Sequence, residues 1–62
     1  MLQPIIEMLN VCGLAELATR LRVRGRGNRR RARLVELLLA YEDMAAVASG
    51  AMLLASDVRY RL

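Results

Sequence analysis

Arginine crowds the stretch from Arg20 to Arg33, which holds eight of the ten basic residues of this 62-residue chain. No acid interrupts the stretch, and the nearest carboxylates are Glu16 before it and Glu36 after it. A guanidinium group presents a planar fork of N–H donors that binds phosphate in bidentate fashion, whereas a lysine ammonium acts as a point charge. A GC-rich coding sequence is a second explanation for the absence of lysine. The chemistry that these side chains offer is the binding of phosphate or of another anion.

Turn-forming residues divide this stretch. Gly25, Gly27 and Asn28 favour turns and left-handed backbone, and apolar residues at helical spacing flank them on both sides. The arginines are therefore expected around a basic turn, residues 24–29, between two helices. The candidate phosphate-binding residues are Arg20, Arg22, Arg24, Arg26, Arg29, Arg30, Arg31 and Arg33.

The two sides of the turn differ in their expected effect on helix stability. Arg20, Arg22 and Arg24 would close the first helix, where positive charge meets the negative end of the backbone dipole. Asn28 is a good N-cap, and residues 29–31, all arginine, would then form the first turn of the next helix, against its positive end. These charges oppose folding and repel one another, so a bound phosphate explains them better than a solvated surface does.

A first helix is predicted over residues 4–23. Pro4 suits its first turn, where the missing N–H costs nothing. The apolar face rotates by roughly 120° at Gly13, taking about 100° per residue. Two interpretations stay open: the helix breaks at Gly13, or one helix passes through it and contacts two neighbours. The first face comprises Leu2, Ile5, Ile6, Leu9 and Cys12, and the second comprises Leu14, Leu17, Ala18 and Leu21.

A long second helix is predicted over residues 30–55, with two apolar stripes that each require a neighbour. The first helix would cover one stripe, and a second copy of the chain would cover the other. An alternative ends this helix at Ser49–Gly50, but the constant phase of the first stripe favours continuity. That stripe is Leu34, Leu37, Leu38, Tyr41, Ala45, Ala48 and Met52. The predicted oligomer interface is Val35, Leu39, Ala46, Gly50 and Leu53.

The expected fold is one all-α domain over residues 1–62, a helical hairpin of two or three helices that assembles as a dimeric four-helix-type bundle. A chain this short buries only about 60% of its unfolded surface, so a single core is marginal. Cys12 is the only cysteine and histidine is absent, which excludes an internal disulfide and a structural zinc site. Self-association into a homodimer or higher homo-oligomer is therefore expected.

The C-terminal segment, residues 56–62, is expected to form a last turn or a short strand-like end. Ser56 or Asp57 is able to cap a short turn there. Extension of the basic surface by Arg59 and Arg61 is the alternative to simple solvation of the terminus.

Catalytic chemistry is not expected. Histidine is absent, and the one close carboxylate pair, Glu42 and Asp43, diverges by about 100° on a helix. Cys12 would lie on the apolar face of the first helix as a buried, inert thiol. The sequence therefore predicts no enzyme activity, cofactor, metal or small-molecule substrate.

Neither a membrane span nor a signal peptide is expected. The apolar run 34–55 contains three acids, Glu36, Glu42 and Asp43, and the opening residues 1–7 have no basic start. The expected location is intracellular, in the cytoplasm or in the nucleus or nucleoid.

Two functions compete. The net charge of +4 and the clustered arginines favour binding to the phosphates of duplex or structured nucleic acid, RNA slightly more than DNA. If half of the eight arginines touched phosphates in each protomer, a dimer would bind duplex DNA with a log–log salt slope near −7. Tyr41 is assigned to the core, which leaves only Tyr60 for base stacking and disfavours single strands. The alternative is a helical protein-interaction module whose arginines meet an acidic partner surface.

Overall fold

The structure of the chain, a computed structural model, describes residues 2–41 and 44–62. Its elements are α1 (Gln3–Glu7), α2 (Val11–Leu21), α3 (Arg31–Leu39), α4 (Ala45–Ala55) and the short 3-10 helix η1 (Val58–Tyr60). The predicted all-α class is confirmed, although the described residues form four α-helices where the sequence predicts two or three.

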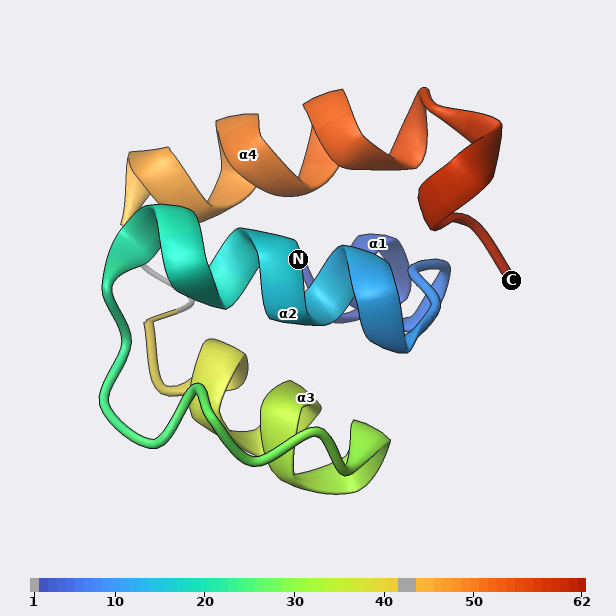
Figure 1. Cartoon of the computed structure of the whole chain (residues 1–62). Coiled ribbons are helices and arrows are strands. Elements are labelled where there is room, and N and C mark those ends of the chain that lie inside the picture. The colour runs from blue at the N-terminus through green and yellow to red at the C-terminus, as the bar shows by residue number, and fades with distance from the viewer. Residues whose placement is uncertain (1, 42–43) are drawn as a thin grey trace.

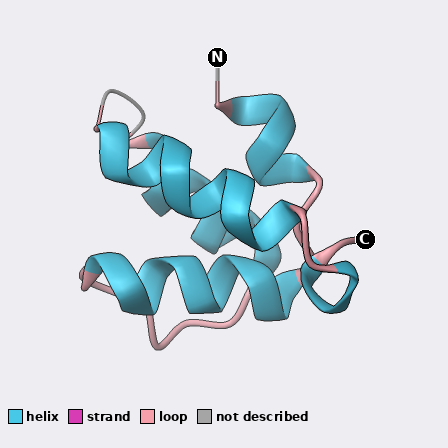
Figure 2. Ribbon diagram, turned by 90° about the horizontal axis from the view of Figure 1, so that it is seen from above, coloured by secondary structure: helices cyan, strands magenta, loops and turns pink. Residues whose placement is uncertain are grey.

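Helix α2 packs against α3, α4 and η1. It runs between α4 on one side and α3 on the other, with α1 behind it (Figure 1). Seen from above, α1 and α2 lie on either side of α4 (Figure 2). The core between these helices is aliphatic, as expected for a chain without Phe or Trp. Its largest fully buried side chains are Ile6, Leu9, Leu14, Leu17, Val23, Leu34, Leu38 and Val47.

The first helical region breaks into two helices, as one of the two interpretations predicts, but the break lies at residues 8–10 and not at Gly13. α1 ends at Glu7, and α2 starts after Asn10, whose extended backbone (φ −77°, ψ 177°) and side chain cap the new helix. The Oδ1 atom of Asn10 accepts a hydrogen bond of 2.8 Å from the Gly13 N–H. A side-chain cap of this kind satisfies one of the N–H groups that every helix start leaves without a partner, which fixes where α2 begins.

Gly13 is required by close packing inside α2 rather than by a helix end. A Cβ atom at this position would lie 2.8 Å from the Tyr60 carbonyl oxygen and 3.0 Å from the Tyr60 Cβ. The absent side chain lets the C-terminal segment approach the α2 backbone. Gly13 therefore lies where η1 packs on α2.

The predicted single helix over residues 30–55 is wrong, because α3 ends at Leu39 and α4 begins at Ala45. Met44 is extended (φ −84°, ψ 127°) at the start of α4, and its N–H donates to the Tyr41 carbonyl at 2.9 Å. The acids between them, Glu42 and Asp43, lie outside the described residues. A straight rod would carry the second half of this region away from α2, whereas two helices bury apolar side chains on opposite sides of it.

Because of this break, the residues of α4 that face the core differ from those of the predicted stripe. Its buried residues are Val47, Ala51 and Leu54, whereas Met52 of the predicted stripe is 61% exposed. The predicted continuity through Ser49–Gly50 is confirmed, since both residues lie inside α4. A Cβ atom on Gly50 would lie 2.7 Å from a Leu17 methyl group, so this glycine faces α2.

The structure also tests two smaller predictions, on Cys12 and on the C-terminal segment. Cys12 is exposed rather than buried, because α2 starts a new helix axis after Asn10 and turns its second residue outward. The backbone of the C-terminal segment is docked on the α1–α2 connection, whereas Arg59 and Arg61 are exposed, as expected for a solvated terminus. Asp57 caps η1 as predicted, by accepting a hydrogen bond of 3.0 Å from the Arg59 N–H.

Candidate anion-binding surface

The candidate surface is the arginine-rich connection, residues 22–30, between α2 and α3. It leaves the end of α2, crosses the molecule and runs along α3 to reach the start of that helix (Figure 1). Arg22 ends α2 with its backbone in the left-handed conformation (φ 55°, ψ 43°). A residue other than glycine adopts this conformation only at a cost of about 1–2 kcal/mol. Glycine would fill this position with less strain, so the backbone does not explain the arginine.

Local contacts hold the connection in a defined path. Val23 is 1% exposed, and its N–H donates to the Ala18 carbonyl at 3.0 Å, which anchors the first residues to the core. Gly25 has φ +82° and accepts a hydrogen bond of 3.1 Å from the Asn28 N–H, which closes the turn. These contacts restrain the backbone of the connection, which lowers the conformational entropy that its backbone loses upon binding.

The start of α3 differs from the prediction. Arg30, not Asn28, occupies the N-cap position, and it makes no side-chain capping bond. Asn28 instead accepts a hydrogen bond of 3.0 Å from the Arg30 N–H and shapes the residues before the helix. Arg29 and Arg30 therefore precede the first turn of α3, contrary to the prediction. Of the eight candidate arginines, Arg31 and Arg33 lie within that turn.

Two of the eight candidate arginines are neutralised by neighbouring acids on their own helices. Arg20 pairs with Glu16 at 3.2 Å on α2, and Arg33 pairs with Glu36 at 3.1 Å on α3. The spacings are i,i+4 and i,i+3, which bring side chains together on a helix surface. These pairs are exposed, and each contributes about 0.2–1 kcal/mol at most. The sequence contained this signal, because the two acids are those nearest to the arginine-rich stretch.

Arg31 has a structural partner that the sequence does not reveal. Its Nη2 atom donates to the Glu7 carbonyl at 2.7 Å, and its Nη1 atom donates to the Leu9 carbonyl. These carbonyls lie at the end of α1 and just beyond it, where helical backbone leaves acceptors without partners. The guanidinium fork therefore ties the start of α3 to the α1–α2 connection. No pattern of spacing could have found this contact, since it joins residues more than twenty positions apart.

The remaining arginines of the candidate set stay exposed. Arg26 makes one hydrogen bond, 3.2 Å from its Nη1 atom to the Val23 carbonyl. Among residues 2–41 and 44–62, no hydrogen bond or ion pair engages the other four side chains, which we name the open arginines. The open arginines are Arg22, Arg24, Arg29 and Arg30.

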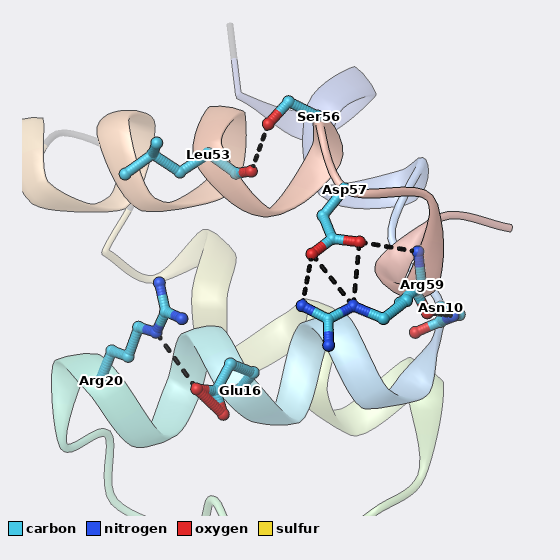
Figure 3. A network of polar contacts seen from close by, with 7 residues as sticks. All are labelled: Asn10, Glu16, Arg20, Leu53, Ser56, Asp57 and Arg59. Carbon is cyan, nitrogen blue, oxygen red and sulfur yellow. Dashed lines mark hydrogen bonds and ion pairs between the residues drawn. The ribbon is translucent and has the colours of Figure 1, made fainter.

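The C-terminal segment carries a separate ion pair at the other end of α2 (Figure 3). Asp57 accepts from Arg59 through both carboxylate oxygens, with Oδ2 lying 2.7 Å from Nη2. This side-chain bond, with a second bond from the Arg59 backbone N–H, holds the pKa of the Asp57 carboxyl below its usual range. The same contact raises the pKa of Arg59, whose guanidinium also lies 5.4 Å from the centre of the Tyr60 ring.

No family model, curated protein or solved structure matches this chain.

The predicted oligomer interface is not one continuous surface. Leu53 is 66% exposed and Ala46 is exposed on the outside of α4, whereas Gly50 faces Leu17 in the same chain. Val35 and Leu39 are partly buried against the chain's own core. Of the five predicted interface residues, Ala46 and Leu53 are exposed, and both lie on α4.

The described residues hold no group of three His, Cys, Asp or Glu side chains close enough to bind a metal ion. Their surface also contains no pocket. None of the helices formed by these residues is long and apolar enough to cross a membrane.

Proposed function

We propose that this protein is a nucleic-acid-binding protein, not an enzyme, and that its open arginines contact the phosphates of duplex or structured RNA or DNA. The observation that carries the proposal is the lack of a carboxylate partner for these four exposed side chains within the described residues. Like charges on neighbouring residues of the connection repel one another, and bound phosphates relieve that repulsion.

The composition of the exposed connection favours phosphate over an acidic protein surface. Every exposed residue between 22 and 30 is arginine, glycine or asparagine, and the one apolar residue, Val23, is buried. Protein interfaces place apolar and aromatic side chains at their centre, whereas contacts to nucleic-acid backbone are made by arginine, amide groups and backbone N–H groups. The connection has the composition that is typical of contacts to nucleic-acid backbone.

The aromatic residues support a duplex or structured ligand over a flexible single strand. Tyr41 and Tyr60 are both partly buried against the core, and Tyr60 also lies beside the Arg59 guanidinium. Single-strand binding draws on exposed aromatic rings on which bases stack. Recognition through phosphate and helix shape, the mode typical of duplex RNA, needs no such ring.

A salt titration of the unmodified protein with a generic DNA duplex tests the proposal. If each open arginine neutralises one phosphate, the log–log slope is about −3.6 per chain, and affinity falls roughly 150-fold between 50 and 200 mM salt. Fluorescence anisotropy measures both quantities, and a matched RNA duplex measures the RNA preference. A slope near zero, or no binding at 50 mM salt, would contradict the proposal.

We also propose that the chain self-associates through the outer face of α4. This helix has no ionisable residue along its length, and it exposes Met52 and Leu53 at 61% and 66%. An uncharged face can meet its own copy across a two-fold axis without charge repulsion, and the contact leaves the connection accessible.

A charge placed on this face is expected to separate the copies. L53E puts two carboxylates close together across the two-fold axis, which disfavours the dimer. Multi-angle light scattering is expected to give a dimer for the unmodified chain and a monomer for L53E. V58E, at a 79% exposed position outside α4, serves as the control and should remain dimeric. A monomeric unmodified chain would refute self-association without affecting the phosphate contacts.

A further inference from the structure

The C-terminal segment is fixed to the α1–α2 connection by hydrogen bonds from both sides. The Leu62 N–H donates to the Met8 carbonyl at 2.9 Å, and the Asn10 N–H donates to the Tyr60 carbonyl at 2.8 Å. Leu9 and Arg61 face each other in an isolated antiparallel bridge. The backbone of Arg61 therefore has a fixed place.

Asn10 joins this segment to the start of α2. Its Oδ1 atom caps α2, while its Nδ2 atom donates to the Arg59 carbonyl at 2.8 Å and to the Arg61 carbonyl at 3.4 Å. One amide side chain thus serves both the helix and the tail, using its acceptor for the first and its donor for the second.

The same connection also receives the start of α3. Arg31 donates to the Leu9 carbonyl, and Leu9 is the residue that bridges to Arg61. Arg31 directly follows Arg29 and Arg30 in sequence. Leu9 therefore brings the tail, from the end of the chain, to the side of the molecule where the arginine-rich connection ends.

Arg59 and Arg61 lie two positions apart but differ in their partners. Arg59 is bound by both oxygens of Asp57, which neutralises its charge. Arg61 is exposed, and its side chain has no hydrogen bond or ion pair with any residue in the described parts of the chain. The tail thus presents one neutralised arginine and one that is open to an anion.

We propose that Arg61 belongs to the same phosphate-binding surface as Arg29 and Arg30, and that Asn10 is the positioning residue that holds it there. This inference rests on the proposed function and adds a fifth open arginine from a distant part of the sequence. A nucleic-acid backbone that follows the connection past Arg30 would meet Arg61 next.

Arg61 and Arg59 provide a matched pair for the test. R61Q is expected to weaken binding to a generic DNA duplex by roughly tenfold at 50 mM salt and to reduce the magnitude of the slope by about 0.9. R59Q removes the same charge but is expected to change affinity less than about twofold, because its partner already neutralises it. Equal losses for the two variants, or no loss for R61Q, would overturn the inference.

A substitution at Asn10 tests positioning. N10S keeps a side-chain oxygen able to cap α2 but removes the amide that holds the tail carbonyls. In the N10S background, R61Q is expected to weaken binding less than about threefold, because the tail no longer holds Arg61 in place. An undiminished R61Q effect would exclude Asn10 as the positioning residue. If the unmodified chain does not bind duplex at all, the proposed function fails and this inference fails with it, whereas binding that is indifferent to R61Q overturns this inference alone.

Discussion

Changing the four open arginines to glutamine should abolish duplex binding while the chain remains folded. The variant R22Q/R24Q/R29Q/R30Q removes four positive charges and takes the formal net charge from +4 to zero. Because these positions no longer attract phosphate, affinity at 50 mM salt is expected to fall by at least about 100-fold, and the magnitude of the salt slope should fall by about 3.6. Glutamine keeps much of each aliphatic stem, so packing is little disturbed.

The fold of this variant should be unharmed, since the four side chains make no bond to any described residue. Removing neighbouring like charges relieves repulsion, so circular dichroism is expected to show an unchanged helix content and an equal or higher melting temperature. A variant that melts higher yet binds duplex as tightly as the unmodified chain would refute the proposed function.

The paired arginines supply the control. R20Q/R33Q/R59Q removes three charges that already have carboxylate partners at 3.2, 3.1 and 2.7 Å. Long-range attraction falls in this variant too, but direct phosphate contacts remain, so most of the salt slope should persist. If the two variants lose equal affinity per charge removed, net charge alone drives binding and the connection is not a site.

Replacing Arg31 should have the opposite effect, a loss of stability. R31A removes two hydrogen bonds from a guanidinium group to the Glu7 and Leu9 carbonyls and leaves these acceptors without their partner. Hydrogen bonds to charged groups contribute about 1.5–3 kcal/mol, and removing a positive charge from a helix N-terminus returns only about 0.3–1 kcal/mol. The expected net loss is about 2 kcal/mol, which lowers the melting temperature by roughly 8–16 °C in a domain of this size.

The neighbouring Arg30 provides the matched comparison for Arg31. R30A is expected to weaken duplex binding and to change the free energy of unfolding by less than about 0.5 kcal/mol, because its exposed side chain makes no bond to a described residue. R31K should be intermediate in stability, since a single ammonium group cannot reproduce the fork that reaches two carbonyls. Equal melting temperatures for R30A and R31A would show that the Arg31 contacts contribute nothing to the fold.

The local features of this protein could be read from its sequence. The absence of Phe and Trp, the helical spacing of leucine and the glycines at the centre of the arginine-rich stretch predict an all-α chain with a basic connection. The continuity of α4 through Ser49–Gly50 and the cap at Asp57 were also predictable. Each of these depends on residues within one or two helical turns of each other, which is the range over which periodicity, capping and turn chemistry act.

Tertiary contacts decided where the helices break. Residues 30–55 have a continuous apolar pattern, yet the chain forms α3 and α4 because two separate helices bury Leu38 and Val47 on opposite sides of α2. Gly13 marks the approach of Tyr60 rather than a helix end, and Tyr60 lies 47 positions further along the chain. Periodicity describes one helix at a time and carries no information on which distant segment will cover it.

The tertiary structure also determines which arginines stabilise the fold and which remain available to a ligand. By sequence alone, Arg29, Arg30 and Arg31 are equivalent members of one run, and their clustering and capacity to bind anions were evident. Only in the folded chain does Arg31 bind carbonyls at the end of α1, while its two neighbours stay exposed and Arg61 pairs with Leu9, whose carbonyl Arg31 also binds. The sequence sets how much positive charge the protein carries, but the meeting of distant backbone carbonyls with particular guanidinium groups determines which charges remain available to a ligand.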